Sequence, residues 1–255
     1  MIKALILAAG YATRLYPLTK EYPKPLLKVR GKPIIEYITD KLNAAGEIEE
    51  IFVITNSKFF PHFKKWQKKA RINKPIKIID DLTRDNADRL GAVGDMHFAI
   101  EQEKIGQDLL IAGGDNIFDE SLDDFITFAK SKGTGSTIGV YDIKGTQKAK
   151  KYGVIGMDER NQVVAFEEKP KDPLSTLVAM CLYYFPKRSL EFIKEYMSKS
   201  NKNSDTTGSY IDWLRKKAPV YAFVFGGRWY DIGDLKFYNE AREKFSKGGE
   251  RNGNA

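Results

Sequence analysis

The chain has 255 residues, of which 42% are hydrophobic, 12% aromatic and 30% charged. This composition excludes an intrinsically disordered chain, and no apolar run approaches the roughly 18 residues that a membrane-spanning helix needs. A single cysteine, Cys181, cannot form an internal disulfide, so the sequence favours a soluble, cytoplasmic protein. The length suits one α/β domain better than two.

Lys and Arg together number 42 against 34 Asp and Glu, which gives a net charge of +8. Such a surplus favours anionic partners in general. The densest basic stretch, residues 64–74, lies beside several aromatic residues, as in a nucleic-acid patch. At helical spacing, however, Phe59, Phe63 and Trp66 fall on one side and the lysines largely on another. The pattern predicts a solvated helix face, and we expect neither a nucleic-acid nor a membrane partner.

The first 140 residues alternate strand-like and helix-like patterns. The apolar run 2–7 predicts a buried parallel strand. The segment 33–45 has apolar residues at helical spacing, with Pro33 in the first turn and Gly46 as a C-terminal stop. The same criteria predict strands at 50–55, 76–79 and 108–112, and helices at 59–69, 89–103 and 122–132. This alternation predicts a parallel sheet with helices on both faces.

After residue 135 the pattern becomes mixed. Strands are predicted at 136–141, 152–157, 162–168, 177–185 and 220–225, and helices at 186–197, 210–217 and 234–247. The polar stretch 158–161 predicts a hairpin connection. No internal repeat or long linker marks the start of a second domain, and the Gly/Asn-rich tail 248–255 is predicted to be disordered. The sequence therefore predicts a single α/β domain with a mixed sheet.

The loop after the first strand carries unusual chemistry. Small residues there let backbone N–H groups approach a phosphate closely. Arg14 offers a planar fork of donors, and Lys24 is a cation between two prolines. Spacing alone also fits a glycine-containing turn followed by a Pro-rich surface loop. The loop by itself leaves phosphate binding and a plain connection equally open.

A longer pattern surrounds this loop. Residues 7–26 read Leu-Ala-Ala-Gly-x-x-Thr-Arg-Leu-x-Pro-Leu-Thr-x-x-x-Pro-Lys-Pro-Leu, and residues 29–34 read Val-x-Gly-Lys-Pro-Ile. The run resembles the signature of sugar-1-phosphate nucleotidylyltransferases, and is most similar to the glucose-1-phosphate thymidylyl- and uridylyltransferases. Further matches are Gly113-Gly114-Asp115-Asn116, Tyr152-Gly153-Val154, Glu167-Glu168-Lys169-Pro170 and Trp229-x-Asp231-Ile232-Gly233. Together the matches cover about residues 2–245.

The resemblance implies a fold and a reaction. The fold is a single Rossmann-like three-layer α/β/α domain with a mixed, mainly parallel sheet, and residues 1–247 form the catalytic domain. The reaction joins a nucleoside triphosphate to a sugar 1-phosphate and releases pyrophosphate, usually with Mg²⁺. The resemblance favours dTTP or UTP as the nucleotide and glucose 1-phosphate as the sugar. Relatives commonly form homo-oligomers, although no feature here fixes an interface.

The resemblance also implies a role for each matched residue. Arg14 would contact the departing pyrophosphate, and Lys24 the α-phosphate, where negative charges are forced together. Asp115 and Asp231 would hold Mg²⁺, which prefers carboxylate oxygens. The residues implied in nucleotide binding are Leu7, Ala8, Ala9, Gly10, Ala12, Thr13 and Gly91. Those implied in sugar-phosphate binding are Gly153, Glu168 and Lys169.

Several of these residues also fit a plainer structural role. Asp115 after two glycines is suited to capping a helix, and Asp231 to a turn. Gly91 fits the start of a helix, and the Glu168–Lys169 pair a surface hairpin with an exposed ion pair. Only the matched pattern as a whole favours the functional roles.

The chain departs from the family pattern at three places. Ala12 stands where the family usually has Gly; we expect it to adopt a negative φ, so that Ala12→Gly would slightly destabilise the loop. Met180-Cys181 replaces a small residue and Gly, and is expected to reshape the sugar pocket, with Cys181 in the core rather than acting as a nucleophile. No hexapeptide β-helix follows the domain.

Two other functions fit parts of the pattern. A cytidylyltransferase acting on a sugar phosphate or another phospho-alcohol would share the first loop, but the matches at Gly153 and Glu168 favour a sugar. A catalytically silent nucleotide-sugar sensor need not retain all of the charged residues that this chain keeps.

Overall fold

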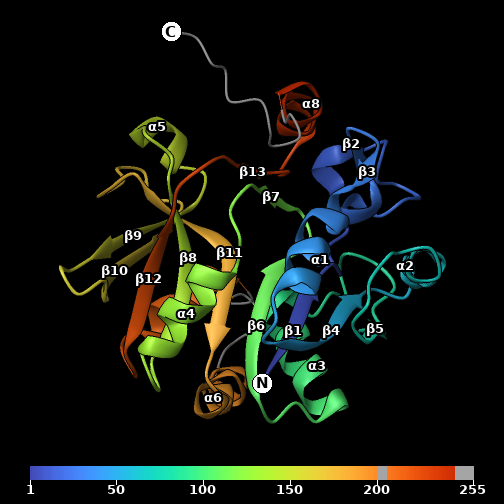
Figure 1. The fold of residues 1–255 in the computed structure, drawn as a ribbon. Helices are drawn as coiled ribbons and strands as arrows, with labels where there is room; N and C mark the ends of the chain where they lie inside the picture. Colours follow the sequence, from blue (N-terminus) through green and yellow to red (C-terminus); the bar gives the residue numbers. More distant parts are fainter. Residues whose placement is uncertain (200–205, 245–255) are drawn as a thin grey trace, which may run out of the picture.

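The computed structural model describes residues 1–199 and 206–244. Its centre is a nine-stranded sheet in which strands run in the order β10-β9-β11-β6-β1-β4-β5, while β8 pairs with β11 and β12 (Figure 1). The strands are β1 (Ile2–Leu7), β4 (Ile48–Thr55), β5 (Ile76–Asp80), β6 (Asp108–Gly113), β8 (Ser136–Asp142), β9 (Gly153–Met157), β10 (Val163–Glu168), β11 (Leu177–Phe185) and β12 (Val220–Phe225). Every strand predicted from the sequence is present.

The sheet is parallel around β1 and antiparallel around β11. β1 pairs in parallel with β4 on one side and with β6 on the other. Its residues Ala4, Leu5 and Ile6 are fully buried, because helices cover both faces. β11 runs antiparallel to β6, β8 and β9, and β12 is parallel to β8. The predicted mixed, mainly parallel sheet is confirmed.

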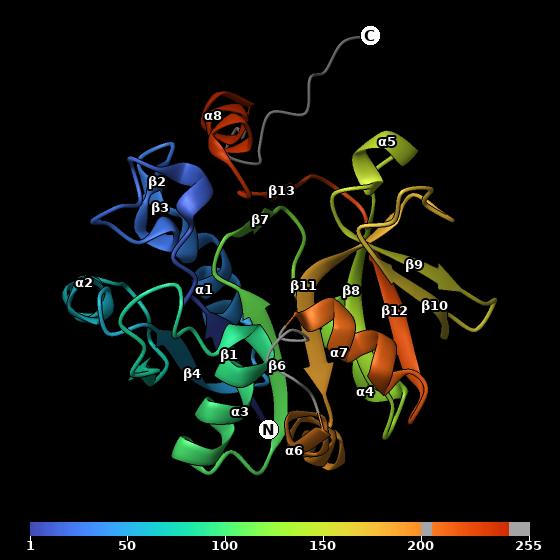
Figure 2. The same ribbon diagram turned by 180° about the vertical axis from the view of Figure 1, so that it is seen from behind.

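In the described part of the chain, three helices pack against each face of the sheet. α1 (Ile34–Ala44), α2 (Phe60–Gln67) and α4 (Asp123–Ser131) pack into one hydrophobic cluster, and Figure 1 shows α1 and α4 on the near side. α3 (Gly91–Glu103), α6 (Leu190–Lys199) and α7 (Thr207–Leu214) pack into the cluster on the opposite face, which Figure 2 turns toward the reader. The three-layer architecture follows from these two clusters.

Some helices begin or end at residues other than the predicted ones, because local contacts decide where a helix starts and stops. α7 covers 207–214 rather than 210–217, because the Thr206 side chain accepts a hydrogen bond from the Ser209 N–H at 3.2 Å and caps the helix. α1 ends at Ala44 with the extended Ala45 as its C-cap, one residue before the predicted end, and Gly46 follows the cap as expected. Such shifts are typical of helix ends.

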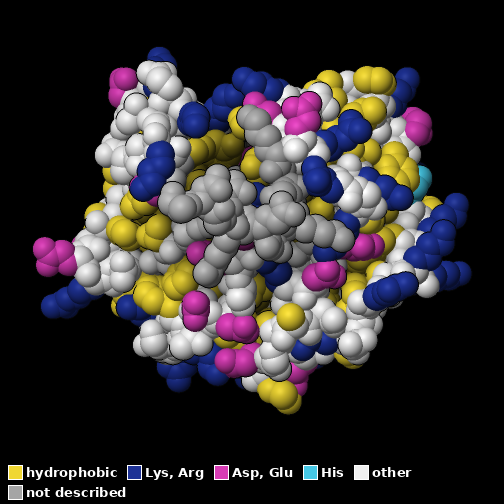
Figure 3. Space-filling view, turned by 45° about the horizontal axis from the view of Figure 1, so that its top comes forward, with side chains coloured by type: hydrophobic (Ala, Val, Ile, Leu, Met, Phe, Trp, Pro, Cys, Tyr) yellow, Lys and Arg dark blue, Asp and Glu magenta, His cyan; other side chains and the backbone are white. Residues whose placement is uncertain are grey.

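The basic stretch lies on α2 as predicted. Phe63 and Trp66 are buried against the sheet, while Lys64 and Lys65 face solvent. Figure 3 shows Lys and Arg side chains projecting on the right, where α2 lies in Figure 1. The helix is amphipathic, and its lysines form its solvated side. Within the described residues, no helix is long and apolar enough to cross a bilayer.

Short elements escaped prediction. They are β2 (Lys28–Val29), β3 (Lys32–Pro33), β7 (Asn116–Phe118), β13 (Trp229–Asp231), α5 (Thr146–Ala149), η1 (Thr13–Leu15) and η2 (Lys24–Leu26), whereas η3 (Lys187–Ser189) lies within the helix predicted at 186–197. Two to four residues are too few to show a hydrophobic period. α8 (Leu235–Lys244) matches the described part of the predicted last helix, and its Tyr238 hydroxyl donates to the Lys28 carbonyl at 2.9 Å. The predicted tail 248–255 lies outside the described residues.

The loops that carry the candidate site residues lie at one edge of the sheet. β1, β4, β5 and β6 are parallel, so their carboxyl ends meet at this edge. β8 and β12 end there too, because both run antiparallel to β11, as β6 does. The two-stranded ladder of β7 and β13 crosses above the edge (Figure 1).

The conformation expected for Ala12 is wrong. Ala12 has φ 47° and ψ 44°, in the left-handed region that favours glycine. Two hydrogen bonds hold its carbonyl in place: one from Leu15 N–H at 2.9 Å and one from the buried Thr19 hydroxyl at 2.8 Å. These bonds fix the turn that begins η1, and the methyl group is strained by about 1–2 kcal/mol.

Ala12→Gly should therefore stabilise the protein. Relief of the strain exceeds the roughly 0.4–1 kcal/mol that glycine costs through the unfolded chain, so the melting temperature should rise. Thermal unfolding of the variant and the parent under identical conditions measures this difference. Ala8→Gly, in the same loop without a positive φ, is the matched control and should lower the melting temperature. An unchanged or lower melting temperature for Ala12→Gly would contradict the strain.

Candidate active site

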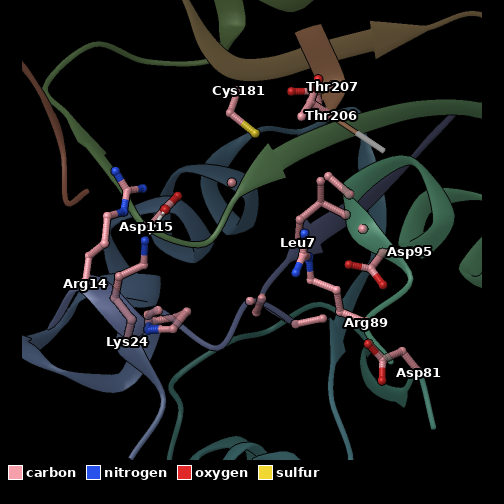
Figure 4. A pocket seen from close by; sticks show the side chains of 18 residues that line it. Leu7, Arg14, Lys24, Asp81, Arg89, Asp95, Asp115, Cys181, Thr206 and Thr207 are labelled. Carbon is pink, nitrogen blue, oxygen red and sulfur yellow. Dashed lines mark hydrogen bonds and ion pairs between the residues drawn. The ribbon is translucent and has the colours of Figure 1, made fainter. Parts of the chain in front are cut away.

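A cleft of about 440 Å³ opens at the carboxyl edge of the sheet (Figure 4). We call it the main cleft. Its walls come from the loop after β1, the loop after β5, the start of α3, the end of β6 and the start of α7. The residues that line it are Leu7, Ala8, Ala9, Gly10, Ala12, Arg14, Lys24, Pro25, Asp81, Arg89, Gly91, Ala92, Asp95, Gly113, Asp115, Cys181, Thr206 and Thr207.

Lys24 and Asp115 form the closest charged contact in the cleft. The Lys24 Nζ lies 2.5 Å from Asp115 Oδ2 and donates a second hydrogen bond to the Ile232 carbonyl at 3.1 Å. Only 14% of the Lys24 side chain is exposed, and Pro23 and Pro25 hold the start of η2 around it. A charge-assisted bond with so little solvent contact orients the ammonium group toward the cleft. The Lys24 ammonium group is therefore held on the wall of the main cleft, beside Asp115.

A second carboxylate stands beside Asp115. β13 pairs with β7 so that Asp231 lies opposite Asn116, and the Ile232 N–H donates to the Asp115 carbonyl at 3.2 Å. Burial and the neighbouring Asp115 charge raise the pKa of Asp231 to about 6, although Lys24 and Arg14 oppose the shift. The structure thus brings together two aspartates far apart in the sequence. Asp115 caps no helix, since a turn and then β7 follow it.

These two aspartates fit a divalent cation better than a purely structural role. Two like charges held close together are destabilising unless a cation lies near them. Mg²⁺ takes one or two carboxylates and completes its shell with phosphate oxygens and water. Within 1–199 and 206–244, no cluster of three or more His, Cys, Asp or Glu is arranged to hold a metal. The donor set therefore suits an ion that a substrate phosphate helps to bind.

The loop after β1 forms the floor of the main cleft. The five residues from Leu7 to Ala12 named in the sequence analysis line it, whereas Thr13 opens η1 and is not among the lining residues. The Asn56 side chain donates to the Ala9 carbonyl at 2.8 Å, and this buried bond holds the loop against the end of β4. Gly91 also lines the cleft, at φ 78° and at the first position of α3. Gly91 therefore both begins α3 and lines the main cleft.

A second hollow of about 190 Å³, the side pocket, adjoins the main cleft. Asp115, Cys181 and Thr207 line both spaces. The other lining residues of the side pocket are Asn116, Lys151, Tyr152, Gly153, Phe166, Glu168, Ala179, Met180, Tyr183, Gly208, Trp229 and Asp231. Asp115 thus lies where the two spaces meet, and Asp231 lines the side pocket next to it.

Two glycines make room for Glu168 in the side pocket. A Cβ at Gly208 would collide with the Glu168 carboxylate, and one at Gly153 would collide with the Phe166 ring. The two glycines therefore let the Glu168 carboxylate and the Phe166 ring pack closely against the backbone at these positions. Trp229 forms an aromatic wall here: its ring nitrogen donates to the Asn116 side chain at 2.7 Å, and Tyr152 packs against it with centroids 5.3 Å apart.

Lys169 does not point into the side pocket. Its side chain is 61% exposed, it lies 3.4 Å from the Glu168 carboxylate, and it is not among the lining residues. Its φ of 49° follows from a turn at the end of β10. Lys151, which the sequence analysis did not select, lines the pocket instead. No motif marks Lys151, because it lies in the lysine-rich stretch 148–151, Lys-Ala-Lys-Lys, which suggests only a solvated surface.

Cys181 belongs to the site rather than to the core alone. It is half-buried and has φ 53°, and Met180 beside it is buried and also lines the side pocket. Burial, together with Asp115 and Asp231, raises the pKa of the Cys181 thiol to about 12. The thiol stays protonated at neutral pH, which agrees with the expectation that it is no nucleophile.

Three charged residues of the main cleft were missed by sequence reasoning. Asp81 follows β5, Arg89 precedes α3 and Asp95 lies on α3. The only available signal was the Asp80-Asp81 pair after a predicted strand, since loops at that edge carry ligand chemistry.

The raised pKa of Asp231 predicts a pH-dependent effect of Asp231→Asn. The fold disfavours the charged form, so the ionised carboxylate destabilises the protein at pH values above about 6. Without divalent metal, Asp231→Asn should raise the melting temperature at pH 7.5, and the gain should shrink as the pH falls toward 4, where Asp231 is neutral. Thermal melts across this range test it. An equal gain at every pH would show that repulsion is not the cause.

Comparison with known proteins identifies the family. A Methanocaldococcus jannaschii protein named bifunctional protein GlmU is 26% identical over 90% of this chain, and a glucose-1-phosphate adenylyltransferase from Fervidobacterium nodosum is 28% identical over 92%. The chain spans 51% and 59% of the lengths of these two relatives. A solved structure of UDP-glucose pyrophosphorylase with UDP-glucose shares the fold, with a TM-score of 0.80, 22% identity, and coverage of 95% of this chain and 98% of that one. The model of the nucleotidyl transferase family matches residues 3–248, and the chain belongs to that family.

Proposed function

We propose that this chain transfers a nucleotidyl group from a nucleoside triphosphate to a sugar 1-phosphate and releases pyrophosphate. One observation carries the proposal. Lys24 and Asp115 come from different loops and meet at 2.5 Å where the main cleft joins the side pocket. A reaction between two phosphorylated substrates needs two adjoining spaces with a cation and a metal-binding carboxylate at their junction.

The reaction forms one P–O bond and breaks another. A phosphate oxygen of the sugar 1-phosphate attacks the α-phosphorus of the nucleotide, and the bond to the β-phosphate oxygen breaks as pyrophosphate leaves. No covalent enzyme intermediate is needed, so positioning and charge neutralisation supply the catalysis. The chain offers groups for positioning and for charge neutralisation where the main cleft joins the side pocket.

Lys24 and Arg14 act on different phosphates in this proposal. Lys24, held at the junction, stabilises the charge that gathers around the α-phosphorus. Arg14 lines the main cleft as an exposed residue, and its planar fork suits the two outer phosphates that leave together. The loop of Gly10 and Ala12 offers backbone N–H groups to the same phosphates.

Asp115 and Asp231 hold the metal in the proposed site. When bound, Mg²⁺ supplies neutralisation of phosphate charge and a fixed geometry for the phosphate oxygens. Glu168 in the side pocket accepts hydrogen bonds from sugar hydroxyls. Lys151, rather than Lys169, is placed to meet an anionic group in that pocket.

The finer substrate assignment starts from the resemblance, which favours dTTP or UTP with glucose 1-phosphate. The names of the relatives include an adenylyltransferase, so membership of the family does not by itself choose a nucleotide. A pyrophosphate-release assay that crosses dTTP, UTP, CTP, GTP and ATP with several sugar 1-phosphates tests the proposal. Release with CTP alone would favour the cytidylyltransferase, and no release with any pair would favour the silent sensor.

The variants Lys24→Ala and Arg14→Ala should change different kinetic parameters. Lys24→Ala should lower kcat by about 100-fold or more, because a charge matched to the transition state is lost. Arg14→Ala should also raise KM for the nucleotide. Lys20→Ala, an exposed lysine of the same loop outside the main cleft, is the matched control and should behave like the parent. If Lys24→Ala changes KM alone, Lys24 binds only the ground state.

Removal of either metal-binding carboxylate should nearly abolish turnover. Asp115→Asn and Asp231→Asn each delete a charge and a ligand while keeping the side-chain size, so the fold should remain intact. Turnover at limiting Mg²⁺, with circular dichroism as the check on folding, measures the effect. EDTA should abolish parental activity, and added Mg²⁺ should restore it. Near-normal turnover in either variant would remove that residue from the metal site.

A further inference from the structure

We infer that Lys41, Asp119 and Arg228 form a clamp that fixes the register of the β7–β13 ladder and thereby positions Asp231 beside Asp115. None of the three clamp residues lines the main cleft or the side pocket, so they act through the backbone of the ladder and are positioning residues. The inference rests on the proposed function, which makes Asp115 and Asp231 the metal-binding pair.

The β7–β13 ladder is too short to hold its own register against the repulsion at its end. Its three residue pairs are Trp229 with Phe118, Tyr230 with Ile117, and Asp231 with Asn116. A slip by one residue would turn the Asp231 side chain to the opposite face, and a slip by two would move it by about 7 Å along the strand. Two neighbouring carboxylates favour such a displacement, because their charges repel each other. Contacts beyond the three pairs must therefore fix the register.

Arg228 and Asp119 extend the ladder by one further pair. The Asp119 N–H donates to the Arg228 carbonyl at 3.2 Å, and the Arg228 Nε donates to Asp119 Oδ2 at 2.8 Å. The side chains of Arg228 and Asp119 are 39% and 30% exposed, and an ion pair in such a position adds little to stability by itself. Here, however, one bond joins the backbones of the two residues and another joins their side chains. Only one register of the ladder satisfies both bonds.

Lys41 holds the β7 side of the clamp from α1. α1 packs beside β7 (Figure 1), and the Lys41 Nζ donates to the carbonyl oxygens of Asp119 at 2.9 Å and Glu120 at 2.6 Å. The ammonium group also lies 4.8 Å from the centre of the Phe118 ring. Burial lowers the pKa of Lys41, while the Asp119 charge opposes this shift. Lys41 thus loses hydration in order to tie the backbone after β7 to α1.

Glu120 ties the same loop to the end of β12. Its Oε2 accepts a hydrogen bond from the Gly226 N–H at 3.0 Å. Gly226 follows β12 directly, and Gly227, with φ 56°, turns the chain toward β13. The turn that leads into β13 is therefore anchored to the loop that Lys41 holds.

The clamp and the candidate metal pair lie at opposite ends of the ladder. At the end near the metal pair, the Ile232 N–H donates to the Asp115 carbonyl, and Lys24 donates to the Ile232 carbonyl. Arg228 and Asp231 are three residues apart, which is about 10 Å of extended strand. Loss of the clamp should therefore let Asp231 move away from Asp115, which weakens metal binding without removing a ligand.

Arg228→Ala should weaken Mg²⁺ binding more than it slows the reaction. Loss of a residue that orients a metal ligand typically weakens metal binding by about 10- to 100-fold. The Mg²⁺ concentration that gives half of the maximal rate of pyrophosphate release should rise by about tenfold or more. At saturating Mg²⁺, kcat should stay within about threefold of the parent, because bound metal selects the correct register. Without substrates, the rise in melting temperature that Mg²⁺ produces should be smaller than in the parent.

Two further variants test whether the clamp acts through its charges. Lys41→Met keeps most of the length of the side chain without its charge, and should raise the Mg²⁺ requirement as Arg228→Ala does. Arg228→Lys retains the positive charge beside Asp119 and should restore most of the Mg²⁺ affinity. An Mg²⁺ requirement in Arg228→Lys as high as in Arg228→Ala would overturn the role of the ion pair.

A measurement without metal separates positioning from a purely structural role. In the parent, Asp231→Asn removes the repulsion and should raise the melting temperature at pH 7.5. In the Arg228→Ala background the two carboxylates can already move apart, so Asp231→Asn should give less than about half of that rise. Equal rises in both backgrounds would show that the ladder keeps its register without Arg228, and would overturn the inference.

Arg215→Ala is the matched control. Arg215 forms a partly exposed ion pair with Asp212 and also donates to the Val164 carbonyl at 2.9 Å, but it lies outside the ladder, the main cleft and the side pocket. The variant should leave both the Mg²⁺ requirement and the effect of Asp231→Asn unchanged. Changes as large as those in Arg228→Ala would contradict a specific clamp.

The two proposals fail separately, because the melting-temperature cycle needs neither metal nor substrate. A smaller effect of Asp231→Asn in the Arg228→Ala background, without pyrophosphate release from any sugar 1-phosphate, would refute the proposed reaction and leave the clamp intact. Pyrophosphate release with an unchanged Mg²⁺ requirement in Arg228→Ala would support the reaction and refute the clamp.

Discussion

The repulsion between two neighbouring carboxylates is the constraint around which the site is built. Asp115 and Asp231 are kept close by the ladder of β7 and β13, although burial and their mutual repulsion disfavour two negative charges there. The fold opposes this cost with Lys24, whose ammonium group contacts Asp115 directly. Such an arrangement is stable only because the sheet beneath it is well packed, and the proposed binding of a cation and phosphates would relieve the repulsion.

Long elements were predictable because their sequences carry a clear period. The apolar run of β1 and the amphipathic pattern of α2 each extend over enough residues to define a buried side. The ladder of β7 and β13 has three residues per strand, and its pairing joins distant segments, so no local pattern could reveal it. The starts of helices depended on individual caps, such as the Thr206 side chain at α7.

The residues of the proposed phosphate site were predictable from one long motif, whereas those at the far ends of the main cleft and of the side pocket were not. Lys24 and Asp115 occupy positions fixed by the ends of neighbouring strands, and the structure brings them together. Lys151 and Asp81 reach the spaces through turns whose direction the sequence does not encode locally. Ala12 shows the same limit in the backbone: hydrogen bonds from the rest of its loop impose a conformation that its own preferences oppose.

The ladder between β7 and β13 also sets the point in synthesis at which the pair of carboxylates can form. The main sheet is complete once β12 has left the ribosome, but the ladder that carries Asp231 comes later in the chain. Its pairing with Asn116 closes a loop of more than about a hundred residues, a long-range contact that forms slowly. A nascent chain that ends after β12 therefore has its scaffold and the phosphate loop but half of the carboxylate pair. The carboxylate pair is thus completed last, after the scaffold that supports it is already in place.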